Sequence, residues 1–283
     1  MTPGRLALTP GRLTVTVGRL AVTDRRSGAR CGGGGWCRGA GVSGAGSRWL
    51  YLARHGEAPE GGVLTATGRR QAELLAERLA EVPLRSVTHS PEQRAAETAG
   101  IVVGARTRAA AGNLTSPVSG SRASQAAGGD ASQAAGGDAA RGAAEGDLEV
   151  REWDAVGDYV PHVPEEPPVA YAGFFDGLSG DERRAGEEWA ELALARFAKP
   201  PTGGPGGDVH ELVVTHAWQV AWFLRAALGA PADRWLGVPV ANCGLTVLRY
   251  TPGRPAAVVV VNDLAHLPAE LRWTGFPPEF VPR

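Results

Sequence analysis

The segment Leu50-Tyr51-Leu52-Ala53-Arg54-His55-Gly56-Glu57 decides how the rest of this 283-residue chain is interpreted. Its first four residues form an apolar run that predicts a buried strand, and arginine, histidine, glycine and glutamate follow directly. Open α/β folds bind their ligands at the carboxyl ends of strands. Arginine offers a rigid set of donors suited to phosphate, and a neutral histidine nitrogen can attack phosphorus. The segment therefore predicts an anion site at the end of a strand.

Two later segments repeat this arrangement. The apolar run Glu211–Val214 is followed by Thr215 and His216. The strand predicted over Leu84–His89 is followed by Ser90 and Pro91, which suit the start of a helix that carries Arg94 in its first turn. The positive end of that helix favours an anion. We expect these strand ends to lie together.

Hydrophobic periodicity and turn residues predict the remaining elements. In the helix over 180–198, Trp189, Leu192 and Phe197 are expected to face the core. In the helix over 69–82, Thr67 is the expected N-cap. The other predicted helices cover 92–103 and 217–228, and the last two predicted strands cover 245–250 and 256–261.

Glycine divides the chain into a foldable part and biased segments. Of the 40 glycines, 17 are crowded into Ser27–Gly46 and Gly112–Gly146, and the second stretch contains the eight-residue unit Ala123–Asp130 given twice. Such segments bury too little apolar surface to offset the entropy of ordering them. We therefore expect a disordered extension over 1–48, one domain over 49–267 with a disordered insertion at about 112–147, and a tail over 268–283.

Composition restricts the compartment and the partners. The formal net charge is −1, from 29 basic and 30 acidic side chains, and the foldable part holds no long basic tract, which argues against nucleic acid or an anionic membrane as partner. Three cysteines cannot form a disulfide framework, and no apolar run reaches the roughly 18 residues of a membrane span. We expect a cytoplasmic protein.

The motifs together resemble the histidine phosphatase superfamily, in its phosphoglycerate-mutase-like branch. The resemblance covers roughly 49–261, and the stretches Asp158–Pro164 and Asn242–Thr246 look like those of the mitochondrial serine/threonine phosphatase group. It implies an α/β fold, a three-layer α/β/α sandwich with a mostly parallel central sheet.

The resemblance also implies roles for the site residues. His55 would be the nucleophile that takes the phosphoryl group. The phosphate oxygens would be held by Arg54, Arg94 and a protonated His216. Glu57 would fix the imidazole or a guanidinium by a charge-assisted hydrogen bond, and Asn242 would be a polar neighbour of the pocket.

Two carboxylates compete for the role of general acid. Glu152, in Val150-Arg151-Glu152, resembles the usual arrangement of the family. Asp158 precedes Pro161 and Pro164, and in the serine/threonine phosphatase group the acid likewise precedes nearby prolines. We favour Asp158, and the sequence leaves Glu152 open.

These roles predict a phosphatase that hydrolyses a phosphomonoester through a phosphohistidine on His55, without a metal or cofactor. The substrate would be a phosphorylated small molecule or a phosphoprotein, and the sequence leaves a homodimer open. One alternative is a non-catalytic module that recognises phosphate. The other is a mutase-like phosphotransferase, against which stands the short segment Ala58–Val63, because mutases of this family carry a longer insertion there.

Overall fold

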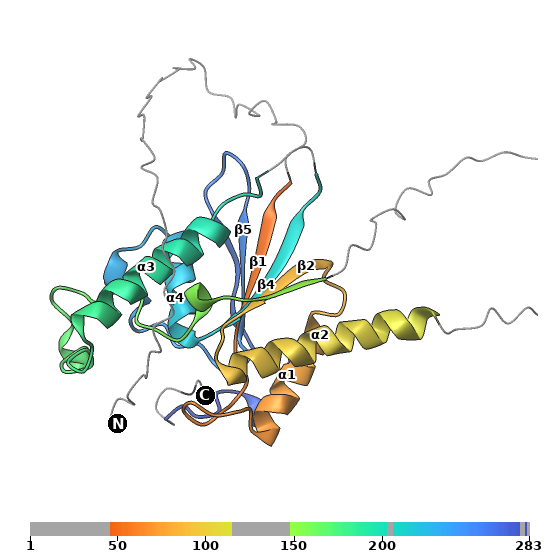
Figure 1. The fold of residues 1–283 in the computed structure, drawn as a ribbon, viewed down its shortest axis with the longest axis horizontal. Coiled ribbons are helices and arrows are strands. Elements are labelled where there is room, and N and C mark those ends of the chain that lie inside the picture. Colours follow the sequence, from red (N-terminus) through yellow and green to blue (C-terminus); the bar gives the residue numbers. More distant parts are fainter. Residues whose placement is uncertain (1–45, 115–147, 203–205, 278–280, 282–283) are drawn as a thin grey trace, which may run out of the picture. The chain divides into compact units, whose positions relative to one another are not determined.

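A computed structural model describes residues 46–114, 148–202, 206–277 and 281 (Figure 1). Most of the extension expected over 1–48 and nearly all of the insertion expected at 112–147 lie outside these residues. The first strand begins at Arg48, and the side chain of Ser47 is buried. Composition had placed the start of the domain at Trp49, and the ordered structure begins slightly before that residue.

The centre of the fold is one sheet of six strands in the order β3-β2-β4-β1-β5-β6. The four strands β3, β2, β4 and β1 run parallel to one another. On the other side of β1, β5 pairs antiparallel with β1, and β6 pairs antiparallel with β5. The expected mostly parallel sheet is confirmed. The strands are β1 (Arg48–Arg54), β2 (Leu84–His89), β3 (Glu149–Glu152), β4 (Val209–Thr215), β5 (Leu245–Tyr250) and β6 (Ala257–Asp263).

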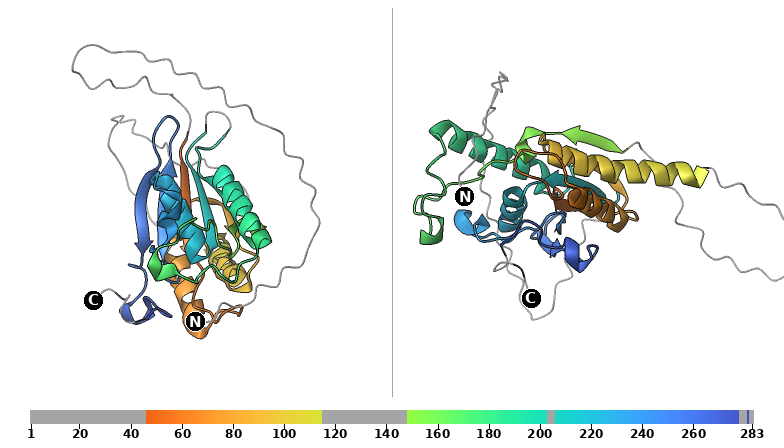
Figure 2. Two further views of the ribbon diagram at one scale, coloured as in Figure 1. Left: turned by 90° about the vertical axis from the view of Figure 1, so that its left-hand side faces the viewer. Right: turned by 90° about the horizontal axis from the view of Figure 1, so that it is seen from below.

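Helices cover both faces of the sheet, which confirms the three layers (Figure 2). Successive side chains of a strand point to opposite faces, so Ala53 of β1 packs toward one helix pair and Leu52 toward the other. The first pair is α1 (Ala66–Arg78) and α2 (Gln93–Leu114), and the second is α3 (Gly180–Phe197) and α4 (Ala217–Ala227). Short 3-10 turns cover Asp154–Val156, Val169–Tyr171, Ala232–Trp235 and Ala269–Leu271.

The helix boundaries differ from the predicted ones at several points. Helix α1 begins three residues early, because the side chain of Thr65, rather than that of Thr67, accepts the capping hydrogen bond from the Gly68 N–H at 3.0 Å. Helix α2 extends well beyond the predicted end at Val103. In α3, Phe197 is buried as expected, whereas Leu192 is 53% exposed and does not face the core.

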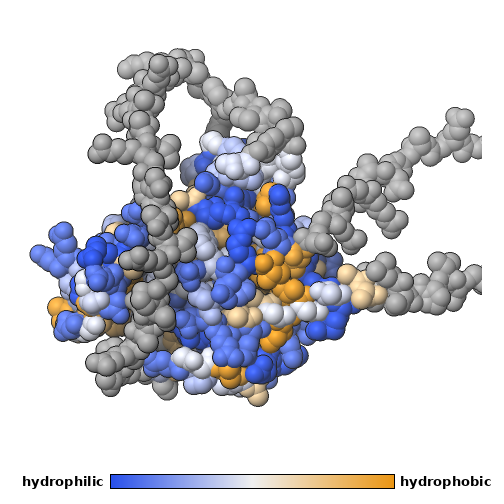
Figure 3. Space-filling model, viewed as in Figure 1, coloured by the Kyte–Doolittle hydropathy of each residue, from blue (hydrophilic) through white to orange (hydrophobic). Residues whose placement is uncertain are grey.

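Strand β3 was not predicted, because its residues are charged and exposed on both faces. It lies at the edge of the sheet beside β2. On the face drawn in Figure 3, which is mostly hydrophilic, hydrophobic residues gather on this side of the sheet. Val150 of β3 is about half exposed.

The first part of the C-terminal segment packs on the domain. Gln71 of α1 is fully buried, and its Nε2 donates to the carbonyl oxygen of Leu271 at 2.8 Å and to Oγ1 of Thr274 at 2.9 Å. Its Oε1 accepts from the Glu57 N–H at 2.8 Å. One side chain therefore joins the segment after His55 to the end of the described chain.

None of the helices in the described ranges is both long and apolar enough to cross a membrane.

Candidate active site

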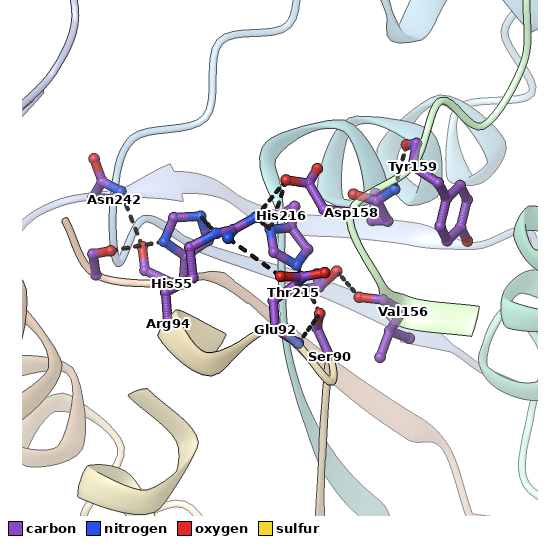
Figure 4. Close-up of polar contacts among 12 residues, drawn as sticks. His55, Ser90, Glu92, Arg94, Val156, Asp158, Tyr159, Thr215, His216 and Asn242 are labelled. Carbon is purple, nitrogen blue, oxygen red and sulfur yellow. Dashed lines mark hydrogen bonds and ion pairs between the residues drawn. The ribbon is translucent and has the colours of Figure 1, made fainter. Parts of the chain in front are cut away.

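The predicted site residues meet at the carboxyl ends of the parallel strands (Figure 4). His55 follows β1 directly, His216 follows β4, and Arg94 lies in the first turn of α2 after β2. The two imidazole rings lie 5.1 Å apart between centroids. The loop after β3 brings Asp158 to the same place.

The His55 imidazole is fixed in an orientation that leaves one nitrogen available. Its Nδ1 lies 2.7 Å from the carbonyl oxygen of Gly56, so Nδ1 carries the proton and donates it. Nε2 then keeps its lone pair, and it accepts a hydrogen bond from Nε of Arg94 at 3.2 Å. Burial, together with the nearby His216 and Arg54, holds the pKa of His55 well below its ordinary value of 6.5. These surroundings favour a neutral ring near pH 7, whose Nε2 has the lone pair that a base or a nucleophile needs.

Arg94 connects the two histidines to the candidate acid. The guanidinium is buried, and its Nη2 donates to Oδ2 of Asp158 at 2.6 Å. The same Nη2 lies 3.4 Å from Nδ1 of His216, which in turn lies 3.5 Å from Oδ2 of Asp158. A tetrahedral anion in this corner would meet a fixed cation and two imidazoles.

His216 lies at the N-cap of α4, and its Nε2 lies 2.8 Å from Oγ of the buried Ser90. Burial and the charges of Arg94 and Arg54 hold the pKa of His216 well below 6.5. These surroundings favour a neutral His216, whereas the protonated form was expected as a partner of phosphate oxygens and stays a prediction. A desolvated site beside two guanidinium groups disfavours a third positive charge.

Arg54 is held from one side only. Its Nη1 donates to the carbonyl oxygen of Val240 at 2.8 Å, while its buried Nε has no hydrogen-bond partner among the described residues. Burial lowers the pKa of Arg54 to about 10, so the group keeps its charge at pH 7. The ring of Phe276 lies 5.6 Å from the guanidinium carbon. A donor without an acceptor is what a phosphate-binding arginine would offer.

Glu57 does not have the expected partner. Its Oε1 accepts from Oγ1 of Thr65 at 2.8 Å, and the structure gives it no hydrogen bond to His55 or to a guanidinium. The carboxylate instead stabilises the residue that caps α1. A close approach explains the adjacent glycine, because a Cβ at Gly56 would lie 2.4 Å from the carbonyl oxygen of Gly68.

Asn242 lies beside the pocket, and its side chain contacts the backbone of His55. Its Nδ2 donates to the carbonyl oxygen of His55 at 3.1 Å. The Cys243 N–H donates to the carbonyl oxygen of Arg54 at 3.1 Å, and Cys243 has a left-handed backbone with φ of 52°. Asn242 therefore positions the His55 main chain in this structure, rather than presenting a donor to phosphate.

The two candidate acids lie in different surroundings. Glu152 is exposed at the end of β3, and none of its described contacts reaches His55 or His216. The loop that carries Asp158 is anchored on both sides, because Oγ1 of Thr215 donates to the carbonyl oxygen of Val156 at 2.6 Å and Nε2 of Gln219 donates to that of Tyr159 at 2.7 Å. The geometry favours Asp158.

Four buried polar residues support the site without having been singled out as site residues. Ser90 contacts His216, and Thr98 accepts from the Gly56 N–H at 3.1 Å and donates to the carbonyl oxygen of Arg94 at 2.8 Å. The other two are Gln71 and Thr215. Of the four, Ser90 and Thr215 had a sequence signal, through their positions before Pro91 and before His216, and Thr98 and Gln71 had none.

The arrangement suits phosphoryl transfer. A neutral imidazole nitrogen, two guanidinium groups and a carboxyl group converge, which supplies a nucleophile, charge stabilisation and a proton donor. Within the ranges that the structure describes, no three histidine, cysteine or acidic side chains gather as metal ligands would. Fold and site together define a histidine-based phosphoryl-transfer protein.

Comparison with known families agrees with that class. The sequence matches the family model of the histidine phosphatase superfamily (branch 1) over residues 50–111 and 146–263. The chain therefore belongs to the histidine phosphatase superfamily.

Among curated proteins, the chain is similar to the serine/threonine-protein phosphatase Pgam5, mitochondrial, of Caenorhabditis briggsae and of Caenorhabditis elegans. Each is 27% identical to it over 78% of this chain and 65% of the relative. The match thus spans slightly less than two thirds of the relatives' length.

Solved structures similar to the chain include the alpha-ribazole phosphatase from Shigella flexneri. That protein is 18% identical, with a TM-score of 0.48 over 76% of this chain and 96% of the other. The phosphoserine phosphatase from Entamoeba histolytica is 17% identical, with a TM-score of 0.48 over 78% and 99% of the two chains.

Proposed function

We propose that the protein is a phosphatase that hydrolyses a phosphomonoester through a phosphohistidine on Nε2 of His55. The observation that carries this proposal is the fixed tautomer: Nδ1 donates to the Gly56 carbonyl oxygen, and Nε2 points its lone pair to the Arg94 corner. A module that only bound phosphate would have no chemical need of a nucleophilic nitrogen there.

In the first step, Nε2 of His55 attacks phosphorus, an N–P bond forms and the bond from phosphorus to the leaving oxygen breaks. A protonated Asp158 gives its proton to that oxygen. Arg54 and Arg94 offset the charge of the equatorial oxygens throughout, since phosphoryl transfer depends chiefly on positioning and electrostatics. His216, neutral in the structure, contributes hydrogen bonding, and an arriving dianion would favour its protonation.

In the second step, water attacks the phosphohistidine, and the carboxylate of Asp158 takes a proton from the water. The N–P bond breaks, inorganic phosphate leaves, and the electron pair returns to Nε2 of His55. Both residues are then in their starting states.

The test is to trap the intermediate. Protein mixed with a ³²P-labelled aryl phosphate and quenched in alkali should carry label on His55, because a phosphoramidate survives base and is lost in acid. His55→Ala should carry no label and release no phosphate while unfolding at the parent temperature. Turnover by His55→Ala within about tenfold of the parent would contradict the nucleophile assignment.

Independence from metal ions is part of the proposal, and it rests on the protein groups that supply charge stabilisation here. Dialysis against EDTA should leave turnover unchanged. Loss of activity in EDTA that a divalent ion restores would point to a metal-dependent mechanism instead.

For the biological setting we propose a phosphorylated small molecule or a phosphoprotein as substrate, in the cytoplasm. The named relatives are serine/threonine-protein phosphatases called mitochondrial. Turnover measured on a panel of phosphomonoesters that includes phosphoserine and phosphothreonine peptides would separate the substrate classes.

A further inference from the structure

A second charged cavity lies at the opposite end of the sheet from His55. It has a volume of about 280 Å³, and its lining includes Arg48 and Val209, the first residues of β1 and β4. This is the end of β1 and β4 drawn at the top of Figure 1. Arg48 and Arg54 stand at the two ends of β1, so roughly 20 Å of strand separates this cavity from the catalytic corner.

The cavity wall carries more positive than negative charge. Its cations are Arg48, Arg85, Arg196 and Lys199, and its acids are Glu149 and Glu211. Glu211 already accepts hydrogen bonds from both Arg48 and Arg196, the latter at 3.0 Å, so two cations surround one carboxylate.

The ion pairs of the other charged residues do not remove the excess of positive charge in the cavity wall. Glu149 forms an ion pair with Arg151 of the same strand. Arg85 and Lys199 are exposed and form no ion pair with any residue in the described ranges. The wall is therefore cationic overall, with two side chains free to turn toward a ligand.

Arg48 has an unused donor at this place. The residue is 5% exposed, and its Nε has no hydrogen-bond partner among the described residues. A buried donor without an acceptor costs on the order of 1–3 kcal/mol, so native proteins rarely leave one unpaired. The guanidinium of this wall residue is therefore not fully neutralised by hydrogen bonds from the described protein groups.

We propose that this cavity binds a small phosphate-bearing anion. A phosphoryl group offers several acceptor oxygens to the guanidinium groups of Arg48 and Arg196. The side chains of Arg85 and Lys199 would bind the same group from the exposed side of the cavity. Ser86 and Thr202 add hydroxyl groups to the wall. The volume lies at the small end of ligand sites, which admits phosphate alone or phosphate on a short organic body.

This inference is independent of the proposed chemistry at His55, and its test keeps the two apart. Equilibrium dialysis with [³²P]phosphate at constant ionic strength counts bound equivalents. The double variant Arg85→Ala/Lys199→Ala should bind one equivalent fewer than the wild type, or bind it at least tenfold more weakly. The charge-matched control Arg70→Ala/Arg184→Ala, also at exposed positions, should keep the wild-type number.

Turnover of an aryl phosphate and the unfolding temperature should be the same in both double variants, because none of the four side chains touches the catalytic groups. An equal number of equivalents and equal affinity in the two variants would overturn the proposal, whether or not the His55 site binds phosphate. Competition then identifies the ligand source: phosphonoacetate displacing label better than unlabelled phosphate indicates a phosphorylated metabolite, and the reverse order indicates free phosphate.

Discussion

Nη2 of Arg94 donates to Oδ2 of Asp158 at 2.6 Å, so the guanidinium that faces the phosphate position also holds the candidate acid. A bound phosphate and Asp158 compete for this donor. Phosphate binding would therefore release the carboxyl group toward the leaving oxygen, at the point in the cycle when a proton donor is needed.

The assignment of the acid can be tested with leaving groups. Asp158→Asn should slow hydrolysis of an alkyl phosphate by about 10²–10⁴-fold, the usual range for general acid catalysis. An aryl phosphate should be slowed less, because its leaving oxygen needs little protonation. The measurement is kcat for both substrates under single-turnover conditions.

Glu152→Gln is the matched control for that experiment. Glu152 is exposed and its described contacts do not reach His55 or His216, so the variant should keep the parent rate on both substrates. The assignment fails if Glu152→Gln alone shows the leaving-group-dependent loss.

Ser90→Ala should lower kcat about tenfold and also cost on the order of 1 kcal/mol of stability, because Oγ of Ser90 also accepts from the Glu92 N–H at 3.2 Å. The change removes the hydroxyl that lies 2.8 Å from Nε2 of His216, and a buried hydrogen bond of about 1.4 kcal/mol corresponds to a factor of ten. Ser179→Ala should affect stability alone. It removes the capping box of α3, which costs on the order of 1 kcal/mol of stability, and should leave kcat unchanged. If both variants lost only stability, Ser90 would have no role in orienting the imidazole.

Gln71→Leu should lower the free energy of unfolding by about 1–3 kcal/mol, because it leaves the Glu57 N–H and the Leu271 carbonyl oxygen without their partner. Urea unfolding measures the loss. Gln93→Leu, at an exposed position, is the control and should be nearly neutral. A Gln71→Leu protein as stable as the parent would show that the C-terminal segment is held by other contacts.

Stability should fall as the pH is lowered through about 6.5. Burial lowers the pKa values of His55 and His216 in the folded state, so below pH 6.5 the unfolded chain binds more protons than the folded one. Each such histidine then lowers the free energy of unfolding by on the order of 1 kcal/mol for each pH unit, until the pH reaches the pKa of that histidine in the folded state. The pKa values of His210 and His266 shift in the same direction.

Urea unfolding between pH 5 and pH 7.5 checks this slope. His55→Gln removes one titrating group and should flatten the dependence relative to the parent. An unchanged slope in His55→Gln would mean that His55 binds protons equally in both states.

Periodicity and residue type were sufficient for the strands with apolar runs and for the start and end of α3. They failed at β3, because Glu149–Glu152 forms a strand through pairing with β2 rather than through a buried face. They also misplaced the cap of α1, where a tertiary contact decides: Thr65 is held by Glu57. Local patterns do not contain such partners.

The site was predictable where a residue follows a strand directly, as His55 and His216 do, and where a residue lies in the first turn of the helix after a strand, as Arg94 does. The role of Glu57 was not predictable, because the imidazole and guanidinium donors of the site were also available to its carboxylate, and only the packing of α1 selects Thr65. Gln71 gave no signal either, since a glutamine in a surface helix is ordinary until the C-terminal segment reaches it.

The position of β1 between β4 and β5 has a consequence for the order of folding. Arg48 pairs with Val209 on one side and with Tyr250 on the other. Both neighbours of β1, the strand that precedes His55, therefore come far later in the chain. Contacts of such sequence separation form slowly, because a long loop must close first. On a ribosome, β1 is synthesised early, gains its first neighbour when β4 has been made and its second only when β5 has been made, so the strand end that precedes His55 is completed late in synthesis.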